Sequence, residues 1–399
     1  IMKVLLINHF PLHGSGSGIY TQNIAKELIK KGHEVFVIDL DNRKDNREYK
    51  FGRRTVLFDV TKNQEPDLPF NFPCFTTHPR SKNTFYKLDY VKIEQYINKL
   101  KEVISQTSEA FQPDIIHAQH IWIIPYIAAL LKIPYVITAH GTDLMGYKKD
   151  PRYHKYAEES VKKCQKIITI SAQVKKDTLS TFNIPKNKVK LIPNGFDQTI
   201  FRKKDIDRQQ FLKQYRLEKI EKKRVISFVG KFTEFKGIDV LLNAAEKVQE
   251  RMDDVVFFLA GDGELRDNME KLAIKLELEN IFFLGHQPQE LIADLYNVAD
   301  LSIVPSRIEP FGLVAIEAMA CGTPVIATNA GGLPDFIDDS VGHLVKMDNT
   351  TALADAILEE LKSNKLNEKS EKAHKLAHEK FSWEKSINKV ISVYKEAIE

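Results

Sequence analysis

The chain has 399 residues, of which 43% are apolar and 28% charged, with a formal net charge of +4. This length and balance exclude a disordered chain or a small disulfide scaffold and favour two globular domains. The charge is uneven: residues 1–200 hold 30 Lys and Arg against 20 Asp and Glu, a net +10, and residues 201–399 hold 28 against 34, a net −6.

The basic half leaves two interpretations open. A basic face would contact an anionic membrane or phosphate-bearing lipids, whereas the alternative is a surface that only aids solubility. Nucleic acid is disfavoured, because no basic stripe interleaved with aromatic residues marks a binding module.

Cysteine usage and apolar runs bear on location. The three cysteines lie far apart without metal spacing, which fits a reducing compartment. No signal-peptide pattern follows Met2, where we expect the natural chain to begin. The most apolar window, residues 121–131, is too short for a membrane span. We therefore expect a cytoplasmic protein, with any membrane contact peripheral and at the inner face.

Short β-branched runs alternate with helical patterns, which is typical of βαβ units and parallel sheets. The polar stretch 201–224 interrupts the pattern, and we expect a domain boundary there. The predicted strands before it are 3–10, 34–40, 55–60, 114–120, 135–140, 167–171 and 189–194. Those after it are 225–230, 255–261, 281–285, 301–306 and 324–328. Ligands of such doubly wound sheets bind outside the carboxyl ends of the strands.

The first candidate site is the glycine loop after strand 3–10. Gly16 and Gly18 lie where a helix begins, so their amides suit an anion. Asp39 lies about 20 residues further on, which leaves a nicotinamide-dependent dehydrogenase open as an alternative. Residues 66–86, rich in Pro and Phe, predict an irregular loop near the ligand cleft.

Histidines mark the ends of two later strands. His140, in "HGTDL", is a candidate donor to a substrate oxygen, and the alternative is a structural imidazole. We interpret His117 and His120 as mostly structural.

Three strand ends of the second half carry phosphate or base candidates. In "VGKFTEFKG" (229–237), Gly230 precedes Lys231 and Lys236, two cations that would neutralise a diphosphate. Gly261, in "AGDGEL", lets a ligand approach the backbone. His286, in "LGHQP", follows a strand whose main chain would hold a base.

The stretch "RIEPFGLVAIEAMACGTPV" (307–325) places Glu309 and Glu317 in an apolar run, where carboxylates are rare without a partner. A helix is predicted to begin near Gly312, so the amides of Phe311, Gly312 and Leu313 suit a phosphate or a sugar hydroxyl. Glu317 would accept hydrogen bonds from a diol. The alternative is that Glu317 pairs with a neighbour.

Metal and cofactor signals are weak. No HExxH, paired CxxC or three-histidine cluster occurs, and "DLD" (39–41) and "DID" (205–207) are too short to indicate a metal site. We expect neither a catalytic metal nor a cofactor. The tail 381–398 predicts a helix with one apolar stripe. The stripe comprises Trp383, Ile387, Val390, Ile391, Tyr394 and Ile398.

These motifs, together with "IPNGFD" (192–197) and "EPFGLVAIEAMACGTPVIATNAGG", resemble those of the retaining glycosyltransferases of family four, or group 1. The resemblance implies the GT-B architecture, in which two facing Rossmann-like domains enclose an interdomain cleft. We expect an acceptor-binding domain over 2–200, a nucleotide-sugar domain over 201–380, and a helix over 381–399 that crosses back to the first.

The resemblance also implies roles. Glu317 matches the residue that binds the ribose diol, Glu309 the one at the donor sugar, and Lys236 the phosphate-binding lysine. Lys231 stands where the family usually has Arg, which keeps the charge but loses bidentate geometry. His140 resembles the histidine at the donor sugar's sixth position. The catalytic set is then Glu309, His140, Lys236 and Lys231. The donor-binding set is Gly16, Gly18, Gly230, Lys231, Lys236, Gly261, His286, Phe311, Gly312, Leu313 and Glu317.

The implied activity is a metal-independent, retaining hexosyltransferase that uses a nucleotide-diphosphate sugar, UDP by family frequency. The acceptor hydroxyl is unknown, and a lipid-linked or other cell-envelope glycan precursor is one expectation. "HGTDL" and "EAMACG" also occur in bacillithiol-pathway glucosaminyl-malate synthases, whereas "IPNGFD" and "EPFG" fit the wider family. Two alternatives stay open: a nucleotide-sugar epimerase of the same architecture, and a non-catalytic nucleotide-sugar-binding subunit.

Overall fold

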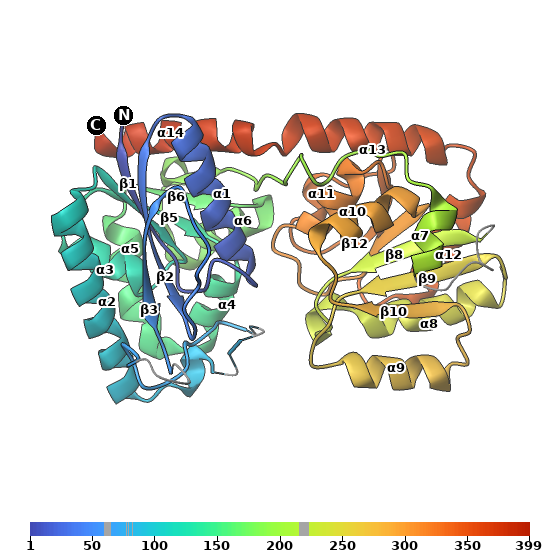
Figure 1. Cartoon of the computed structure of the whole chain (residues 1–399), viewed down its shortest axis with the longest axis horizontal. Coiled ribbons are helices and arrows are strands. Elements are labelled where there is room, and N and C mark those ends of the chain that lie inside the picture. The colour runs from blue at the N-terminus through green and yellow to red at the C-terminus, as the bar shows by residue number, and fades with distance from the viewer. Residues whose placement is uncertain (60–64, 77, 79, 82, 215–222) are drawn as a thin grey trace. The chain divides into compact units, whose positions relative to one another are not determined.

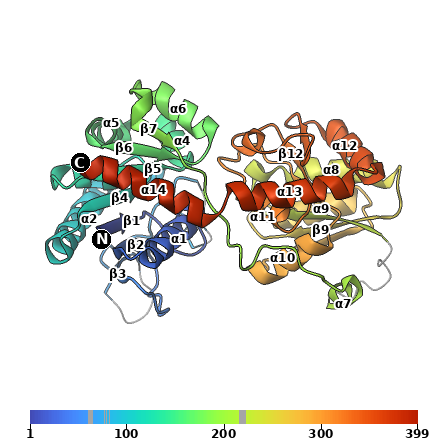
Figure 2. The same cartoon turned by 90° about the horizontal axis from the view of Figure 1, so that it is seen from above.

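The computed structural model describes residues 1–59, 65–76, 78, 80–81, 83–214 and 223–399. Within these ranges the chain forms two compact units. Unit 1 comprises Ile1–Pro193 and Trp383–Glu399, and unit 2 comprises Asn194–Ser382. Figures 1 and 2 show a twisted sheet with helices around it in each unit. The polar stretch 201–224 belongs to unit 2, because Phe201, Phe211 and Leu212 are buried there, although residues 215–222 lie outside the described ranges.

Unit 1 contains a seven-stranded sheet in the order β3-β2-β1-β4-β5-β6-β7, and every ladder is parallel. Its strands are β1 (Lys3–Ile7), β2 (Glu34–Asp41), β3 (Gly52–Leu57), β4 (Ile115–Gln119), β5 (Tyr135–Ala139), β6 (Lys166–Thr169) and β7 (Val189–Leu191). Its helices are α1 (Gly16–Lys30), α2 (Tyr90–Phe111), α3 (Ile124–Leu130), α4 (Thr142–Lys149), α5 (His154–Lys163), α6 (Ala172–Phe182) and α14 (Trp383–Ile398). The order reverses between β1 and β4, which defines the switch point of a doubly wound sheet.

Unit 2 repeats this plan with a six-stranded parallel sheet in the order β10-β9-β8-β11-β12-β13. Its strands are β8 (Arg224–Val229), β9 (Val255–Ala260), β10 (Ile281–Gly285), β11 (Leu301–Val304), β12 (Val325–Thr328) and β13 (Gly342–Val345). Its helices are α7 (Arg208–Gln214), α8 (Ile238–Gln249), α9 (Arg266–Lys275), α10 (Gln289–Val298), α11 (Leu313–Ala320), α12 (Thr350–Lys362) and α13 (Leu366–Lys380). The predicted α/β class with two Rossmann-like domains is confirmed.

Burial explains why the strands read as near-continuous apolar runs. All residues of β4, β5 and β9 are buried, as expected for parallel strands covered by helices on both faces. In unit 1 one cover consists of α1 and α14, which pack together above the sheet, as Figure 2 shows. The predicted stripe of α14 is confirmed for Trp383, Ile387, Val390 and Tyr394, whereas Ile398 is 41% exposed at the helix end.

The Pro- and Phe-rich segment 66–86 is irregular in its described part up to Thr84, as predicted, and a short 3₁₀ helix, Phe85–Lys87, begins at its end. Isolated bridges join Phe58 to Leu68 and Cys74 to Thr84. Residues 77, 79 and 82 of this prediction, and residue 60 of the predicted strand 55–60, lie outside the described residues. No helix within the described ranges has the length and apolarity that a membrane crossing needs.

Candidate functional site

In unit 2 the predicted donor residues follow the carboxyl ends of four strands. The Gly230 N–H donates to the Ala260 carbonyl at 3.0 Å, and the Gly261 N–H donates to the Gly285 carbonyl at 2.8 Å. Gly261 has φ +140°, and a Cβ there would lie 1.8 Å from the Gly230 oxygen. The loops after β8, β9 and β10 are therefore in backbone contact, and this contact requires glycine.

Lys236 and Glu309 lie against each other at this edge. A short 3₁₀ turn, Glu234–Lys236, positions the lysine, whose Nζ is 2.5 Å from Glu309 Oε2. The Ser306 hydroxyl donates to the same oxygen at 3.3 Å. Glu309 is only 8% exposed, so the ammonium of Lys236 supplies the partner that a buried carboxylate needs. The sequence predicted each residue as a ligand group, but not that the two would form a pair.

The glycine turn after β12 supports the main chain of Glu309. The Gly332 N–H donates to the Glu309 carbonyl at 2.9 Å, and a Cβ on Gly331 would lie 1.9 Å from that oxygen. Gly331 has φ +56°, the left-handed region that favours glycine. The "NAGG" motif therefore acts structurally here, by fixing the loop that carries Glu309.

Helix α11 begins as predicted, after Gly312, which has φ +99°. No side chain caps this N-terminus within the described residues, so its first amides lack the partner that caps usually supply. The ring of Phe311 is buried against Phe336 and Phe381, so only its main chain can meet a ligand. Leu313 is half-buried at the first helical position.

Glu317 is the other acid of this segment. It is 8% exposed, and burial raises the pKa of its carboxyl to about 8, with a further contribution from the charge of Asp197. Among the described residues, no hydrogen bond or ion pair joins this carboxyl to another group. The alternative that Glu317 pairs with a neighbour is thus not supported. A buried carboxyl without a partner is costly, which favours a ligand role.

The two other predicted residues of unit 2 are more accessible. Lys231 is half-buried in the loop after β8, and His286 is exposed directly after β10. Both lie at the carboxyl edge of the sheet, after β8 and β10. Their roles toward a ligand stay predictions.

In unit 1 the glycine loop differs from the prediction in one detail. The Ser15 side chain caps α1 by accepting the Gly18 N–H at 3.0 Å, so this amide is already engaged. A Cβ on Gly18 would lie 2.2 Å from the Pro11 carbonyl oxygen. Gly18 therefore permits close packing, whereas Gly16 is exposed with no heavy atom near its Cβ position and is the glycine that a ligand can approach.

His140 follows β5 and is 8% exposed. Its Nε2 lies 2.9 Å from Gln119 Oε1, and its backbone N–H donates to Asp143 Oδ1 at 3.2 Å. Burial lowers the pKa of His140 to about 3, so the imidazole is neutral at physiological pH. Because an amide oxygen only accepts, Nε2 carries the proton and Nδ1 keeps a lone pair.

The other histidines divide into two kinds. His117 is structural, as predicted: its Nδ1 lies 2.6 Å from Tyr394 Oη and its Nε2 lies 2.7 Å from Thr138 Oγ1. His120 is buried with φ +71°, and its Nδ1 has no hydrogen-bond partner among the described residues.

Sequence reasoning missed polar atoms at the ends of β1 and β4. Asn8 Oδ1 and Gln119 Nε2 are buried without a partner within the described ranges, like His120 Nδ1. Buried polar atoms are normally hydrogen-bonded, so these three mark an edge built to meet a polar ligand. The available signal was a polar pair at the end of each buried strand: "NH" (8–9) directly follows β1, and "QH" (119–120) begins with the last residue of β4.

Comparisons with known proteins agree with this geometry. Residues 210–377 match the family described as "Glycosyl transferases group 1", and residues 14–199 match "Glycosyltransferase Family 4". An uncharacterized glycosyltransferase of Methanocaldococcus jannaschii is 31% identical, with 100% of this chain and 99% of the relative covered. The chain therefore belongs to the group 1 glycosyltransferases and is a glycosyltransferase.

Two further matches are more distant. The N-acetyl-alpha-D-glucosaminyl L-malate synthase of Bacillus anthracis is 26% identical, with 95% of this chain and 93% of the relative covered. The crystal structure of Anabaena HepE in complex with UDP and glucose has a TM-score of 0.74 at 19% identity, with 99% of this chain and 100% of that chain covered. This likeness shows the GT-B fold.

Proposed function

We propose that this glycosyltransferase moves a sugar from a nucleotide-diphosphate donor to an acceptor hydroxyl, with retention of anomeric configuration and without a metal. The observation that carries the proposal is the Lys236–Glu309 pair, whose acid lies four residues before Leu313, the uncapped start of α11. A cation and free amides beside a buried acid suit a diphosphate bonded to a sugar.

The donor is recognised by groups of unit 2. The amides at Gly312 and Leu313 and the ammonium of Lys236 bind the diphosphate, and Glu309 accepts from the sugar hydroxyls. The buried carboxyl of Glu317 binds the ribose diol. Its lack of a partner among the described residues supports this role, because two ribose hydroxyls would supply the missing hydrogen bonds.

The reaction exchanges one bond at the anomeric carbon. The bond from C1 to the diphosphate oxygen breaks, and the diphosphate leaves with the electron pair through an oxocarbenium-like state. The acceptor hydroxyl forms the new C1–O bond on the same face, which retains configuration. Its proton passes to an oxygen of the departing diphosphate. Lys236, Lys231 and the helix-end amides stabilise the developing negative charge, which is work that a metal does elsewhere.

We infer a UDP-sugar as donor and a cell-envelope precursor as acceptor class. The first is supported by the HepE complex, which holds UDP, and the second by the wider family. The relative from Bacillus anthracis carries malate in its name, so a small hydroxy acid is another candidate acceptor. A cytoplasmic location, with peripheral membrane contact through the basic half, stays part of this proposal.

The test is a panel of UDP-, ADP- and GDP-sugars, scored for slow hydrolysis and for transfer to added acceptors. We expect one UDP-sugar to be hydrolysed, with release of the α-anomer from an α-donor. Release of the inverted anomer would refute retention. Epimerised donor without hydrolysis would favour the epimerase, and binding of a donor without any turnover would favour the binding subunit. Full activity with excess chelator is expected, and its loss would refute metal independence.

A further inference from the structure

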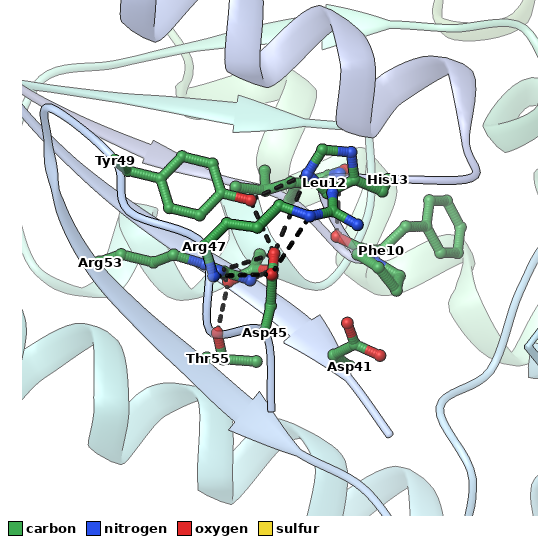
Figure 3. Close-up of polar contacts among 12 residues, drawn as sticks. Phe10, Leu12, His13, Asp41, Asp45, Arg47, Tyr49, Arg53 and Thr55 are labelled. Carbon is green, nitrogen blue, oxygen red and sulfur yellow. Dashed lines mark hydrogen bonds and ion pairs between the residues drawn. The ribbon is translucent and has the colours of Figure 1, made fainter. Parts of the chain in front are cut away.

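A cavity of about 280 Å³ lies in unit 1 beside the glycine loop. We name it the arginine pocket; its lining is His13, Asp41, Arg43, Lys44, Asp45, Asn46, Arg47 and Arg80. Figure 3 shows the polar contacts beside this cavity, where Asp45 lies among the side chains of His13, Arg47, Tyr49 and Arg53. His13 directly precedes Gly14, so the pocket adjoins the loop that ends at Gly16.

Two of the arginines nearby are held in place by buried acids. Arg53 forms a bidentate pair with Asp39, which is fully buried, at 2.9 and 2.7 Å. Arg80 Nη1 lies 2.7 Å from both oxygens of the buried Asp41, and its Nη2 donates to the His13 carbonyl at 3.1 Å. These pairs order the pocket walls before any ligand arrives.

Asp45 is shared among several groups. It accepts from Arg53 Nη1 at 3.1 Å and from the Tyr49 hydroxyl at 2.7 Å, and it lies 3.7 Å from Arg47 Nε. The charge of Asp45 is therefore already paired with Arg53. The contact to Arg47 is longer, and the Arg47 side chain is 56% exposed, so it is available to a ligand.

Arg43 and Lys44 complete the lining with positive charge that the protein does not neutralise. Both are exposed, and no ion pair joins either one to an acid within the described part of the chain. The lining thus carries four cations against Asp41 and Asp45, a net +2 with His13 neutral. Burial lowers the pKa of His13 to about 4, and Arg47, Arg53 and Arg80 also lower it against the opposing effect of Asp45, as expected in a positive field.

We propose that the arginine pocket binds a doubly charged oxyanion, a phosphate monoester or a dicarboxylate, carried by the acceptor. The inference rests on the proposed function and deepens it, because it names the acceptor's chemical class. Arg43, Lys44 and Arg47 contact the anion, while Arg53 and Arg80 keep the walls in position. Guanidinium groups suit such an anion because they donate two parallel hydrogen bonds to its oxygens.

A surface that only aids solubility would not need this construction. Such charges are solvated and independent, whereas here Asp39, Asp41 and Asp45 order arginines around one cavity. The pocket belongs to unit 1, whereas the Lys236–Glu309 pair assigned to the donor belongs to unit 2. The anion is for this reason assigned to the acceptor and not to the donor.

The test is calorimetric titration of the full chain with inorganic phosphate and, separately, with L-malate. We expect millimolar or tighter binding of one of them, and the preferred probe identifies the class. The double variant Arg43→Gln/Lys44→Gln and the variant Arg47→Gln should each bind at least about tenfold more weakly. Arg54→Gln and Lys50→Gln, exposed cations of the same region outside the lining, are matched controls and should bind as the wild type does.

Three outcomes would overturn the inference. These are no binding of either probe, equal loss in the control variants, and loss of binding in Lys236→Ala or on addition of UDP, which would place the anion at the donor groups. Thermal unfolding of each variant shows whether it folds. The titration measures binding and needs no turnover, so its result is independent of donor hydrolysis. Hydrolysis by the wild type without binding of either probe would refute the arginine pocket alone. Binding of a probe without hydrolysis of any donor would refute the proposed function alone.

Discussion

The ammonium of Lys236 lies 2.5 Å from a carboxylate oxygen of Glu309, 73 positions further along the chain. Lys236 comes from the turn after β8 and Glu309 from the loop after β11, two strands that are neighbours in the sheet. The pair therefore places a cation and an acid at the switch point of the second sheet, where the strand order reverses between β8 and β11. In the proposed reaction the cation meets the diphosphate and the acid meets the sugar, so the two act on either side of the bond that breaks.

Lys236→Ala should weaken binding of the donor by about 10- to 100-fold, because hydrogen bonds to charged groups contribute about 1.5–3 kcal/mol. Calorimetric titration with UDP-glucose measures the effect. Lys271→Ala, an exposed lysine on α9, is the control and should bind normally. Unchanged affinity in Lys236→Ala would show that the lysine serves only to neutralise Glu309.

Glu309→Gln should reduce turnover at least about 100-fold, as loss of one well-placed electrostatic contact does in other active sites. Folding should change much less, by about 1 kcal/mol, since Lys236 is partly exposed and can be solvated once the charge is gone. Initial rates and thermal unfolding are compared on the same preparations. If Glu309→Gln lost activity only because a matching fraction of the protein was unfolded, Glu309 would have a structural role and not a catalytic one.

Most of the strands could be predicted because parallel, doubly covered strands are apolar throughout. β13 (Gly342–Val345) was missed, because it is an edge strand with a half-exposed centre and lacks the apolar run. The C-terminal ends of some strands were predicted too far along the chain: the first predicted strand covers 3–10, whereas β1 ends at Ile7. The cause is visible in Phe10, which is buried in the loop and extends the apolar pattern beyond the last ladder pair.

The candidate site was predictable only where its residues follow strand ends. That rule located Glu309, Lys236 and His140 at the carboxyl edges of the sheets. It could not find pairs between distant segments, such as Arg80 with Asp41 across 39 positions, because spacing carries no information on them. Nor could it separate Gly16 from Gly18, since the use of the Gly18 amide depends on the side-chain conformation of Ser15.

Gly261→Ala should destabilise unit 2 by roughly 2–4 kcal/mol, because the new Cβ would overlap the Gly230 carbonyl at a positive φ. Chemical denaturation measures the loss. Gly16→Ala is the matched comparison, since space is open around its Cβ position, and it should stay within about 1 kcal/mol of the wild type. Equal stability of the two variants would contradict the close contact between the loops after β8 and β9.

Glu317 should make the free energy of unfolding fall as the pH rises. Its folded pKa is raised from 4.5 to about 8, so the folded state holds the proton more tightly than the unfolded state does. The stabilisation is fully present below pH 4.5 and is lost progressively up to about pH 8, by an amount on the order of 4 kcal/mol. Glu317→Gln stays neutral, so its stability relative to the wild type should rise over this range. Parallel pH curves for the two proteins, measured by denaturation without nucleotide, would contradict the shift.

The same group should make donor binding depend on pH in the opposite sense. The ribose hydroxyls donate to an ionised carboxylate, so binding favours loss of the proton from Glu317 and lowers its pKa. Affinity for UDP-glucose, whose diphosphate keeps its charge, should therefore rise between pH 6 and about pH 8 and then level off. Glu317→Gln should bind more weakly and with little pH dependence in this range. A wild-type affinity that is flat with pH would mean that the diol does not bind the ionised carboxylate, because binding would then be independent of the proton that burial retains.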